Sequence, residues 1–430
     1  MLNNDHESFA AAQARAAAAV SCESVVLPSG LTVLCRTMPG YSSVHAIYAT
    51  GFGSIHRAFK LDGKQVTLPA GTAHFLEHKM FEQEDETNVF AEYAKFGGNA
   101  NAFTSSNTTA YYFSSTEHFY ENLGILLNFV EKPYFTPENV AKEQGIIGQE
   151  IRMYDDDPDW CLYFNFLKNL YKNHNIRKDP AGTIESIAKI DAPLLYECYN
   201  TFYHPSNMVL VVVGQFEEEK VFEIIDQKIP CQEQQGKIER LYETETEEVV
   251  KNTVEQVLEV GTPKFMAGGK LLNLPQNTYL KNEIVLAILL KLLFSKTSDL
   301  FTKLYQNGII NENFYPDLEH TRDYCYWCVS GESENPDLVF EELKTELSNL
   351  SDKGVREEEF ICAKRSVLGT HVRRYNDPEL LSRIIMDYAF QNADLFAYET
   401  ELENITKEDI NEMIRRLVNS ELVLSVIKPS

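Results

Sequence analysis

Residues 137–158 read PENVAKEQGIIGQEIRMYDDDP, and residues 356–378 read REEEFICAKRSVLGTHVRRYNDP. The two stretches share a pattern at an offset of 221 residues, the difference between positions 138 and 359. Identical residues stand at the paired positions Glu138 and Glu359, Gly148 and Gly369, Arg152 and Arg373, Tyr154 and Tyr375, and Asp156 and Asp377. A period this long is far beyond that of a solenoid repeat, so it indicates a duplicated domain.

A second match further along the chain supports the duplication. Ile187-x-Lys189-x-Asp191 is echoed by Ile405-x-Lys407-x-Asp409, and an apolar run follows each, at 209–213 and at 422–426. Two short matches can be coincidence, but their common order and similar offset favour duplication. The polar stretch before residue 249 contains Pro230 and is the best linker candidate. We therefore expect two halves, residues 1–230 and 249–430, joined by a linker at 231–248.

Strand and helix patterns alternate along the chain. Alternating or continuous apolar residues next to turn residues predict strands at 25–27, 31–35, 46–50, 100–105, 110–114 and 209–213. Helical spacing of apolar residues predicts helices at 71–81, 88–96 and 137–154. The fold class expected is α+β, with two similar duplicated halves that each carry a β-sheet packed by helices.

The composition excludes some classes of partner. With 430 residues and 44% hydrophobic side chains, the chain is long enough for two or more folded domains. Its net charge of −25 argues against nucleic acid and against anionic membrane surfaces, because both repel an acidic face. The apolar run 284–294 is too short to span a bilayer and is interrupted by Lys291.

The cysteines and the N-terminus suggest the compartment. The eight cysteines have no framework spacing, which suits a reducing environment. Cys325-x-x-Cys328 is the one close pair, and a zinc ribbon needs two such pairs, so we expect buried strand residues there. The first 21 residues lack a basic start and Arg15 interrupts their apolar stretch, which predicts a surface helix rather than a signal peptide. We expect a soluble, cytoplasmic protein.

The sequence HFLEH at residues 74–78 is the clearest chemical motif. On a helix, His74 and His78 return to nearly the same face, so both imidazoles can reach one metal ion. A catalytic zinc ion takes three protein ligands and a water, and Glu77 is placed to accept a proton from that water. The motif is HExxH reversed. These five residues alone leave open a simple solvated helix face.

A third ligand is expected on the predicted helix 137–154. Glu143 and Glu150 are seven residues apart, about two helical turns, so they share a face among small and apolar neighbours. Glu150 is the candidate ligand, and Glu143 is the candidate for orienting a ligand or shuttling a proton.

The second half lacks these groups. At the same offset, Glu143 and Glu150 become Lys364 and His371, and residues 74–78 become 295–299, with no ligand set. We therefore expect one catalytic half and one non-catalytic half.

Several motifs in order resemble one family. They are GTAHFLEH at 71–78, GGNANAFT at 97–104 with Tyr111 following, the carboxylates at 143 and 150, and FYHPSNM at 202–208. Together they resemble, nearly end to end, the pitrilysin/insulinase-type (inverzincin) zinc metallopeptidases, in the single-length branch similar to mitochondrial processing peptidase subunits. The resemblance implies a LuxS/MPP-like fold with a mostly antiparallel sheet in each half.

The resemblance also implies roles for individual residues. It implies one Zn²⁺ per chain held by His74, His78 and Glu150, with Glu77 as general base and Glu143 as a supporting carboxylate. It implies that a strand edge holds the substrate backbone by strand addition, which suits extended peptides. That edge comprises Asn101, Ala102, Phe103 and Thr104. The expected function is a zinc-dependent endopeptidase that cleaves peptides or unfolded protein segments, working as a homodimer or as a heterodimer with a related subunit.

The chain departs from the family pattern in two places. His78 and Glu150 are 72 residues apart (150 minus 78), slightly fewer than is usual. Family members also carry an Arg and a Tyr in the non-catalytic half that stabilise the oxyanion. The candidates here are Arg322 with Tyr324 or Tyr326, and the alternative is that all three are fold residues. If another chain supplies the pair, the alternative is a non-catalytic or conditionally active partner subunit of a heterodimeric processing peptidase.

Overall fold

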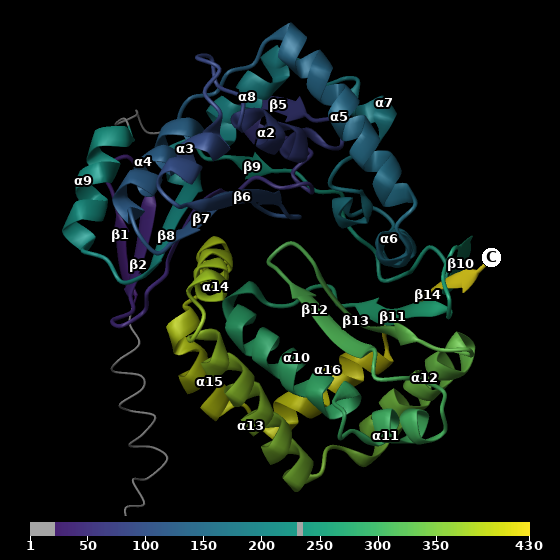
Figure 1. Ribbon diagram of the computed structural model, residues 1–430. Helices are drawn as coiled ribbons and strands as arrows, with labels where there is room; N and C mark the ends of the chain where they lie inside the picture. The colour runs from purple at the N-terminus through teal and green to yellow at the C-terminus, as the bar shows by residue number, and fades with distance from the viewer. Residues whose placement is uncertain (1–21, 230–234) are drawn as a thin grey trace, which may run out of the picture.

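The structure is a computed structural model that describes residues 22–229 and 235–430. In Figure 1 the chain forms two α+β halves, one above the other, the first coloured purple to teal and the second green to yellow. The surface helix expected in the first 21 residues lies outside the described residues, as does the start of the expected linker, 231–234.

Six strands form the sheet of the first half, in the order β1-β2-β8-β3-β7-β6. Their bounds are β1 Glu23–Val26, β2 Thr32–Thr37, β3 Val44–Thr50, β6 Asn99–Thr104, β7 Thr109–Ser115 and β8 Met208–Gly214. Only β2 and β8 run parallel, and the other neighbours are antiparallel. Strands β3 and β8 are buried along their whole length because they lie in the middle of the sheet.

The helices of the first half include those predicted from the sequence. They are α2 Thr72–Met80, α3 Val89–Lys95, α4 Phe119–Val130, α5 Pro137–Asp155, α6 Pro158–Leu170, α7 Ile184–Ile187, α8 Ala192–Phe202 and α9 Glu218–Lys228. A capping box of Thr136 and Asn139 starts α5, with Pro137 at its first position. Gly71 precedes α2 at φ 90°, and a Cβ there would lie 2.6 Å from the backbone oxygen of Ala181. Only glycine allows this close approach.

Five strands form the second sheet, in the order β10-β14-β11-β13-β12. Their bounds are β10 Thr253–Leu258, β11 Lys264–Lys270, β12 Phe314–His320, β13 Cys325–Glu332 and β14 Leu422–Pro429. Its one parallel pair is β10 and β14, so every strand has a counterpart of the same orientation in the first sheet. The expected α+β fold with two similar, mostly antiparallel halves is confirmed, and β1 is an addition to the first half.

The helices of the second half come between its strands in an order similar to that of the first half. They are α10 Tyr279–Phe294, α11 Asp299–Gln306, α12 Pro336–Lys353, α13 Glu357–Arg374, α14 Pro378–Phe390, α15 Tyr398–Asn404 and α16 Lys407–Val418. In the repeat, α13 of the second half corresponds to α5 of the first, and α14 corresponds to α6. Cys325 and Cys328 are buried in β13 with free thiols, as strand residues.

One expectation about the repeat is wrong. The offset of 221 does not extend to the helix that carries the HFLEH motif. Helices α10 and α11 precede β12 and β13 just as α2 and α3 precede β6 and β7, so α10 is the counterpart of α2. Residues 295–299 lie at the junction of α10 and α11 instead. The offset fails because α10 is longer than α2, and α10 itself contains no histidine.

The two halves exchange helices. Helix α14 of the second half packs on β3 and β8 of the first sheet, and α6 of the first half packs on β11 and β14 of the second (Figure 1). Polar contacts accompany both exchanges: His45 in β3 and Ser382 in α14 share a hydrogen bond, and Ser425 in β14 donates to the carbonyl of Leu162 in α6. Because α6 and α14 are counterparts in the repeat, the exchange is reciprocal.

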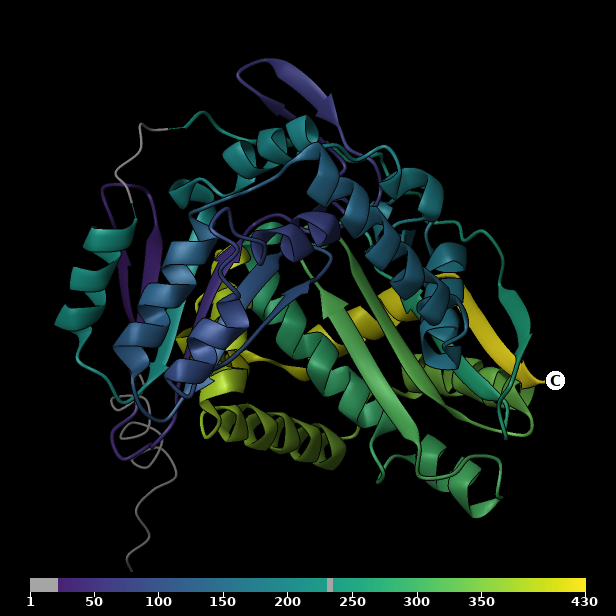
Figure 2. The same cartoon turned by 45° about the horizontal axis from the view of Figure 1, so that its top comes forward.

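The expected linker contains ordered, packed residues. Strand β9, Glu239–Arg240, pairs with one side of β4, Ala58–Leu61. The other side of β4 pairs with β5, Lys64–Thr67. The hairpin β4–β5 projects at the top of Figure 2.

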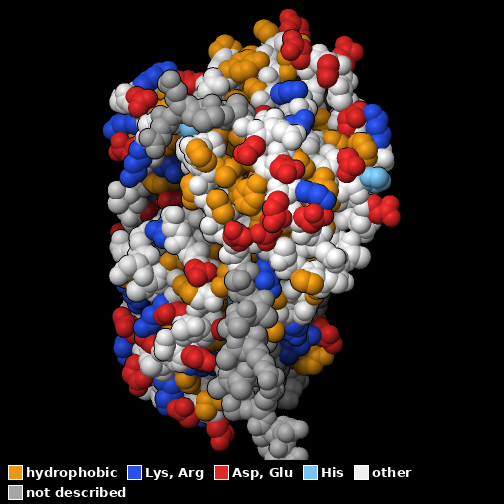
Figure 3. Space-filling view, turned by 90° about the vertical axis from the view of Figure 1, so that its left-hand side faces the viewer, with side chains coloured by type: hydrophobic (Ala, Val, Ile, Leu, Met, Phe, Trp, Pro, Cys, Tyr) orange, Lys and Arg blue, Asp and Glu red, His pale blue; other side chains and the backbone are white. Residues whose placement is uncertain are grey.

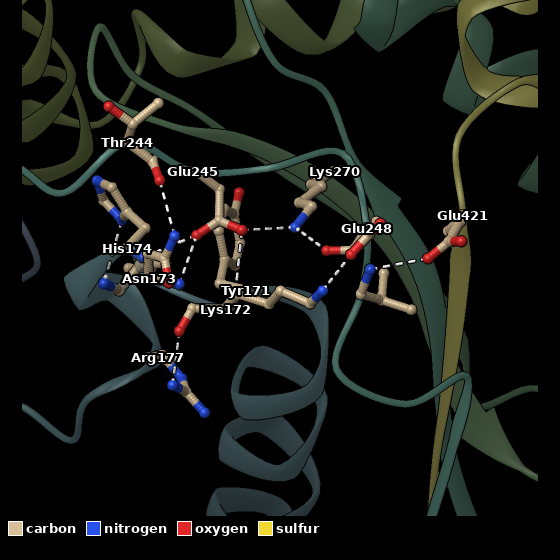
Figure 4. Close-up of polar contacts among 12 residues, drawn as sticks. Tyr171, Lys172, Asn173, His174, Arg177, Thr244, Glu245, Glu248, Lys270 and Glu421 are labelled. Atoms are coloured by element: carbon tan, nitrogen blue, oxygen red, sulfur yellow. Dashed lines mark hydrogen bonds and ion pairs between the residues drawn. The ribbon is translucent and has the colours of Figure 1, made fainter.

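Glu245, later in the linker, contacts both halves (Figure 4). Its carboxylate accepts the backbone N–H groups of Lys172, Asn173 and His174, and it forms a 2.7 Å ion pair with Lys270 of β11. This segment therefore joins the first half to the second sheet.

The surface carries both signs of charge. On the face shown in Figure 3, acidic and basic side chains are interspersed with hydrophobic ones. Within residues 22–229 and 235–430, no helix combines the length and apolar character needed to cross a membrane.

Candidate metal centre

His74, His78 and Glu150 converge between α2 and α5. The Nε2 atom of His74 lies 3.7 Å from Oε1 of Glu150, and the Nε2 atom of His78 lies 3.6 Å from Oε2. Helical spacing places the two imidazoles side by side, with ring centroids 4.5 Å apart. Across the part of the chain that the structure describes, this is the one group of three possible ligands close enough to hold an ion.

The separations fit zinc. In a tetrahedral site with bonds of 2.0–2.2 Å, ligand atoms lie about 3.3–3.6 Å apart. The distances from Glu150 to the two histidines are close to that range. Two imidazoles and one carboxylate are also a donor set typical of catalytic zinc with one open position.

Glu143 forms a hydrogen bond with one of the histidines. Its Oε1 lies 3.0 Å from Nδ1 of His78, which leaves Nε2 of that ring facing Glu150. A carboxylate that holds the far nitrogen of a ligating histidine is a common support for metal sites. Burial alone would lower the pKa of His78, but the hydrogen bond to Glu143 and the nearby carboxylates raise it above its usual value. The site therefore favours positive charge at this position.

His74 is the more buried of the two histidines. Burial and the neighbouring His78 lower the pKa of His74 to about 3. The ring is therefore neutral at physiological pH, which is the form that binds a metal.

Glu77 lies on the same helix and contacts the edge strand. Only 8% of it is exposed, and its Oε2 accepts a 2.6 Å hydrogen bond from Oγ1 of Thr104 in β6. Burial raises the pKa of Glu77, although the hydrogen bond from Thr104 and the charge of His78 oppose the rise. A carboxylate with a raised pKa is suited to accept and release a proton near neutral pH.

The residues expected to hold substrate lie on a sheet edge. Residues 101–104 belong to β6, the outermost strand of the first sheet, which pairs with β7 on one side. On its open side the backbone N–H of Ala102 donates to Oδ1 of Asn101, 2.8 Å away. An incoming strand would have to displace that side chain. The guanidinium of Arg383 in α14 lies 5.0 Å above the ring of Phe103.

A cavity of about 740 Å³ lies between the two halves. From the first half it is lined by Phe103, the turn 105–108 and Trp160, and from the second half by residues of α10, β12 and α14. Phe103 is next to Thr104, so the cavity reaches the strand that contacts Glu77.

The candidates for the oxyanion pair already have partners. Arg322 donates through Nε to the carbonyl of Gln391 and through Nη1 to Gln276. The Tyr326 hydroxyl lies 2.7 Å from that of Tyr163. Tyr324 lines the cavity, where its hydroxyl contacts Ser106 of the β6–β7 turn and lies 3.5 Å from Glu319.

One residue of the site was not anticipated from the sequence. The Tyr154 hydroxyl donates a 2.8 Å hydrogen bond to Oε1 of Glu150. The signal was present, because residues four apart on a helix are neighbours, and Tyr154 follows Glu150 by four.

Comparisons with known proteins find similar sequences along most of the chain. Residues 68–183 match the family described as Insulinase (Peptidase family M16), and residues 189–367 match the Peptidase M16 inactive domain. An uncharacterized zinc protease, YmfH of Bacillus subtilis strain 168, is 40% identical over 396 residues, which cover 90% of this chain and 92% of the relative.

Solved structures show the same architecture. A crystal structure described as an M16-like peptidase from Alicyclobacillus acidocaldarius superposes with a TM-score of 0.91 at 33% identity, covering 95% of this chain and 98% of that one. A protease from Helicobacter pylori has a TM-score of 0.80 at 19% identity, over 95% of this chain and 99% of that one, and shows the fold alone. The family matches and the long, similar relatives lead to one conclusion: this chain belongs to the M16 (insulinase) peptidase family.

Proposed function

We propose that the protein is a zinc-dependent endopeptidase that hydrolyses peptides or unfolded protein segments. The observation that carries the proposal is the convergence of His74, His78 and Glu150 beside the buried carboxylate of Glu77. The relatives named zinc proteases support the metal and the reaction class.

The chemistry follows from the residues in place. His74, His78 and Glu150 would hold one zinc ion, with Glu143 fixing the ring of His78. A zinc ion held there would polarise the peptide carbonyl and make a water molecule more acidic. Glu77 would accept the proton at Oε1, because Oε2 is engaged by Thr104, and then deliver it to the leaving amine nitrogen.

The substrate class follows from the edge strand and the cavity. An extended peptide would add to the open side of β6 at residues 101–104 through backbone hydrogen bonds. Folded proteins present few free strands, and the cavity between the halves is about 740 Å³, so short peptides and unfolded segments fit best.

The central test compares wild type with Glu77→Gln. Both proteins are purified without chelators, zinc is measured by mass spectrometry, and cleavage is followed with a quenched peptide library. We expect about one zinc per chain in both and cleavage only in wild type. Wild type that contains no zinc in a metal-preserved preparation would overturn the proposal, as would equal cleavage by the variant.

A second candidate is a conditionally active subunit of a heterodimer. It is favoured by the engagement of Arg322 with Gln391 and Gln276, which leaves open where the oxyanion-stabilising pair comes from. This candidate predicts zinc without cleavage until a related subunit is added. Light scattering would show whether the chain alone forms a homodimer. Cleavage by wild type alone would rule this candidate out.

We also propose a cytoplasmic location. The free, buried thiols of Cys35, Cys198, Cys325 and Cys328 support a reducing compartment.

A further inference from the structure

The ligand candidate Glu150 has a hydrogen-bond donor of its own on α5. Tyr154, one turn later, donates from its hydroxyl to Oε1 of Glu150 at 2.8 Å. An ionised carboxylate only accepts hydrogen bonds, so the tyrosine is the donor. The same Oε1 lies 3.7 Å from Nε2 of His74, while Oε2 faces Nε2 of His78 at 3.6 Å.

The ring of Tyr154 is held in place by α6. It stacks on the indole of Trp160, with ring centroids 4.3 Å apart and an interplanar angle of 13°. The indole Nε1 donates in turn to Oδ2 of Asp179 at 2.6 Å, and Oδ1 of Asp179 accepts the backbone N–H of Ala181 at 2.8 Å. Tyr154, Trp160 and Asp179 therefore contact one another in succession.

The row ends at the start of the helix that carries the histidines. The carbonyl of Ala181 packs against Gly71, where only a glycine fits, and Ser186 donates to the carbonyl of Ala70 at 2.8 Å. Residues 70 and 71 lead directly into α2. The contacts thus connect Glu150 on α5 with the start of α2 through three side chains and the backbone of Ala181, outside the metal site itself.

We propose that Tyr154 is a positioning residue for the metal centre: its hydroxyl holds Oε1 of Glu150 and thereby fixes the carboxylate, whose two oxygens face the Nε2 atoms of His74 and His78. The inference rests on the proposed zinc site. Groups that hydrogen-bond a ligating carboxylate fix its orientation and increase metal affinity. Trp160 and Asp179 act one step further out by fixing the tyrosine ring.

The second half provides a matched control. Tyr375, at the repeat position of Tyr154, has its hydroxyl 2.9 Å from Nε2 of His371, four residues earlier on α13. His371 stacks on Tyr398 and does not belong to the ligand group found in the described residues. Tyr154→Phe and Tyr375→Phe therefore remove the same hydroxyl from the same place on equivalent helices, but only the first touches a metal ligand.

The experiment measures metal binding rather than turnover. Wild type, Tyr154→Phe and Tyr375→Phe are stripped of metal, and zinc affinity is measured by competition with a chromophoric chelator. Cobalt(II) is then added to each, and its visible absorption reports the ligand geometry. We expect Tyr154→Phe to bind zinc roughly tenfold more weakly and to shift the cobalt spectrum. We expect Tyr375→Phe to match wild type in both.

The outcomes separate this inference from the proposed function. Wild type that binds neither ion would overturn both. Wild-type affinity and spectrum in Tyr154→Phe would overturn the positioning role alone, and so would an equal loss in Tyr375→Phe. Circular dichroism of the metal-free proteins checks folding.

A second variant, Trp160→Phe, keeps an aromatic ring against Tyr154 but loses the bond to Asp179. We expect it to weaken zinc binding, but by less than Tyr154→Phe does, and an unchanged affinity would contradict the contribution of Trp160 and Asp179.

Discussion

His45 and Ser382 are 337 residues apart in the sequence and share a 2.6 Å hydrogen bond in the core of the molecule. His45 lies in the first sheet and Ser382 in α14 of the second half, and neither side chain is more than 1% exposed. The bond marks the interface where the second half packs a helix on the first sheet. We therefore expect the free energy of unfolding to depend on this contact.

The interface should weaken in acid. Burial, with the charge of Arg383, lowers the pKa of His45 to about 3, against 6.5 for an ordinary histidine, although Asp377 opposes the shift. Between these values the unfolded chain binds a proton that the folded chain does not, so stability falls as pH falls from about 6.5 towards 3. The slope is up to about 1.4 kcal/mol per pH unit.

This prediction is checked by urea unfolding of wild type and His45→Gln at pH 7 and pH 5. Other groups titrate equally in both proteins, so the difference between their slopes reports His45. We expect wild type to lose more stability than the variant over this range. Parallel losses would show that this histidine does not titrate as described.

The ion pair of Glu245 and Lys270 should contribute strongly to the free energy of unfolding, because it holds the linker to the second sheet. Burial would raise the pKa of Glu245, but the bond to Lys270 and three backbone N–H groups lower it to about 2, so it is ionised. Glu245→Gln leaves Lys270, which is 1% exposed, as a buried charge with a weakened partner. We expect a loss of about 3–5 kcal/mol in unfolding free energy.

The matched control for that variant is Glu248→Gln in the same segment. Glu248 pairs with Lys172 at the surface, where its side chain is 73% exposed. Its replacement should leave the unfolding free energy close to that of wild type, because an exposed ion pair contributes little. Similar losses in the two variants, measured by chemical denaturation, would contradict the role assigned to Glu245.

Thr104 should tune the proposed general base. Its hydroxyl bonds the charged form of Glu77, which opposes the rise in pKa caused by burial. Thr104→Val removes that bond, so the pKa of Glu77 should rise further and the acidic limb of the kcat/KM profile should move to higher pH. On the acidic limb, the loss of one hydrogen bond to a charged group corresponds to a rate that is roughly tenfold lower at a given pH. Thr104→Ser keeps the hydroxyl and should restore the profile, whereas two identical profiles for Val and Ser would exclude this effect.

Strand addition at β6 should depend on the backbone of Ala102. Its N–H points away from β7 and is covered by Asn101, so Ala102→Pro deletes one donor on the open edge without breaking the sheet. We expect a rise in KM of roughly tenfold or more for extended peptides, with melting temperature within a few degrees of wild type. An unchanged KM in a folded variant would mean that substrate binds elsewhere.

The sequence by itself determined the parts of this protein that depend on local geometry. Spacing of four residues placed His74 and His78 on one face of a helix, and spacing of seven did the same for Glu143 and Glu150. The repeat of residues 137–158 at 356–378 predicted two similar halves, because the same spacing of apolar residues in both stretches predicts the same secondary structure. The family motifs extended this to the edge strand at 101–104.

Only the tertiary structure decided which distant residues meet. The contact of Thr104 with Glu77, the row from Tyr154 to Asp179 and the helix exchange at Ser382 all depend on the path of the chain between sheets. The fixed offset failed at α10 because loop and helix lengths changed after duplication. Periodicity reports the face on which a side chain lies, whereas its partner across the core is set by how the sheets and helices pack together.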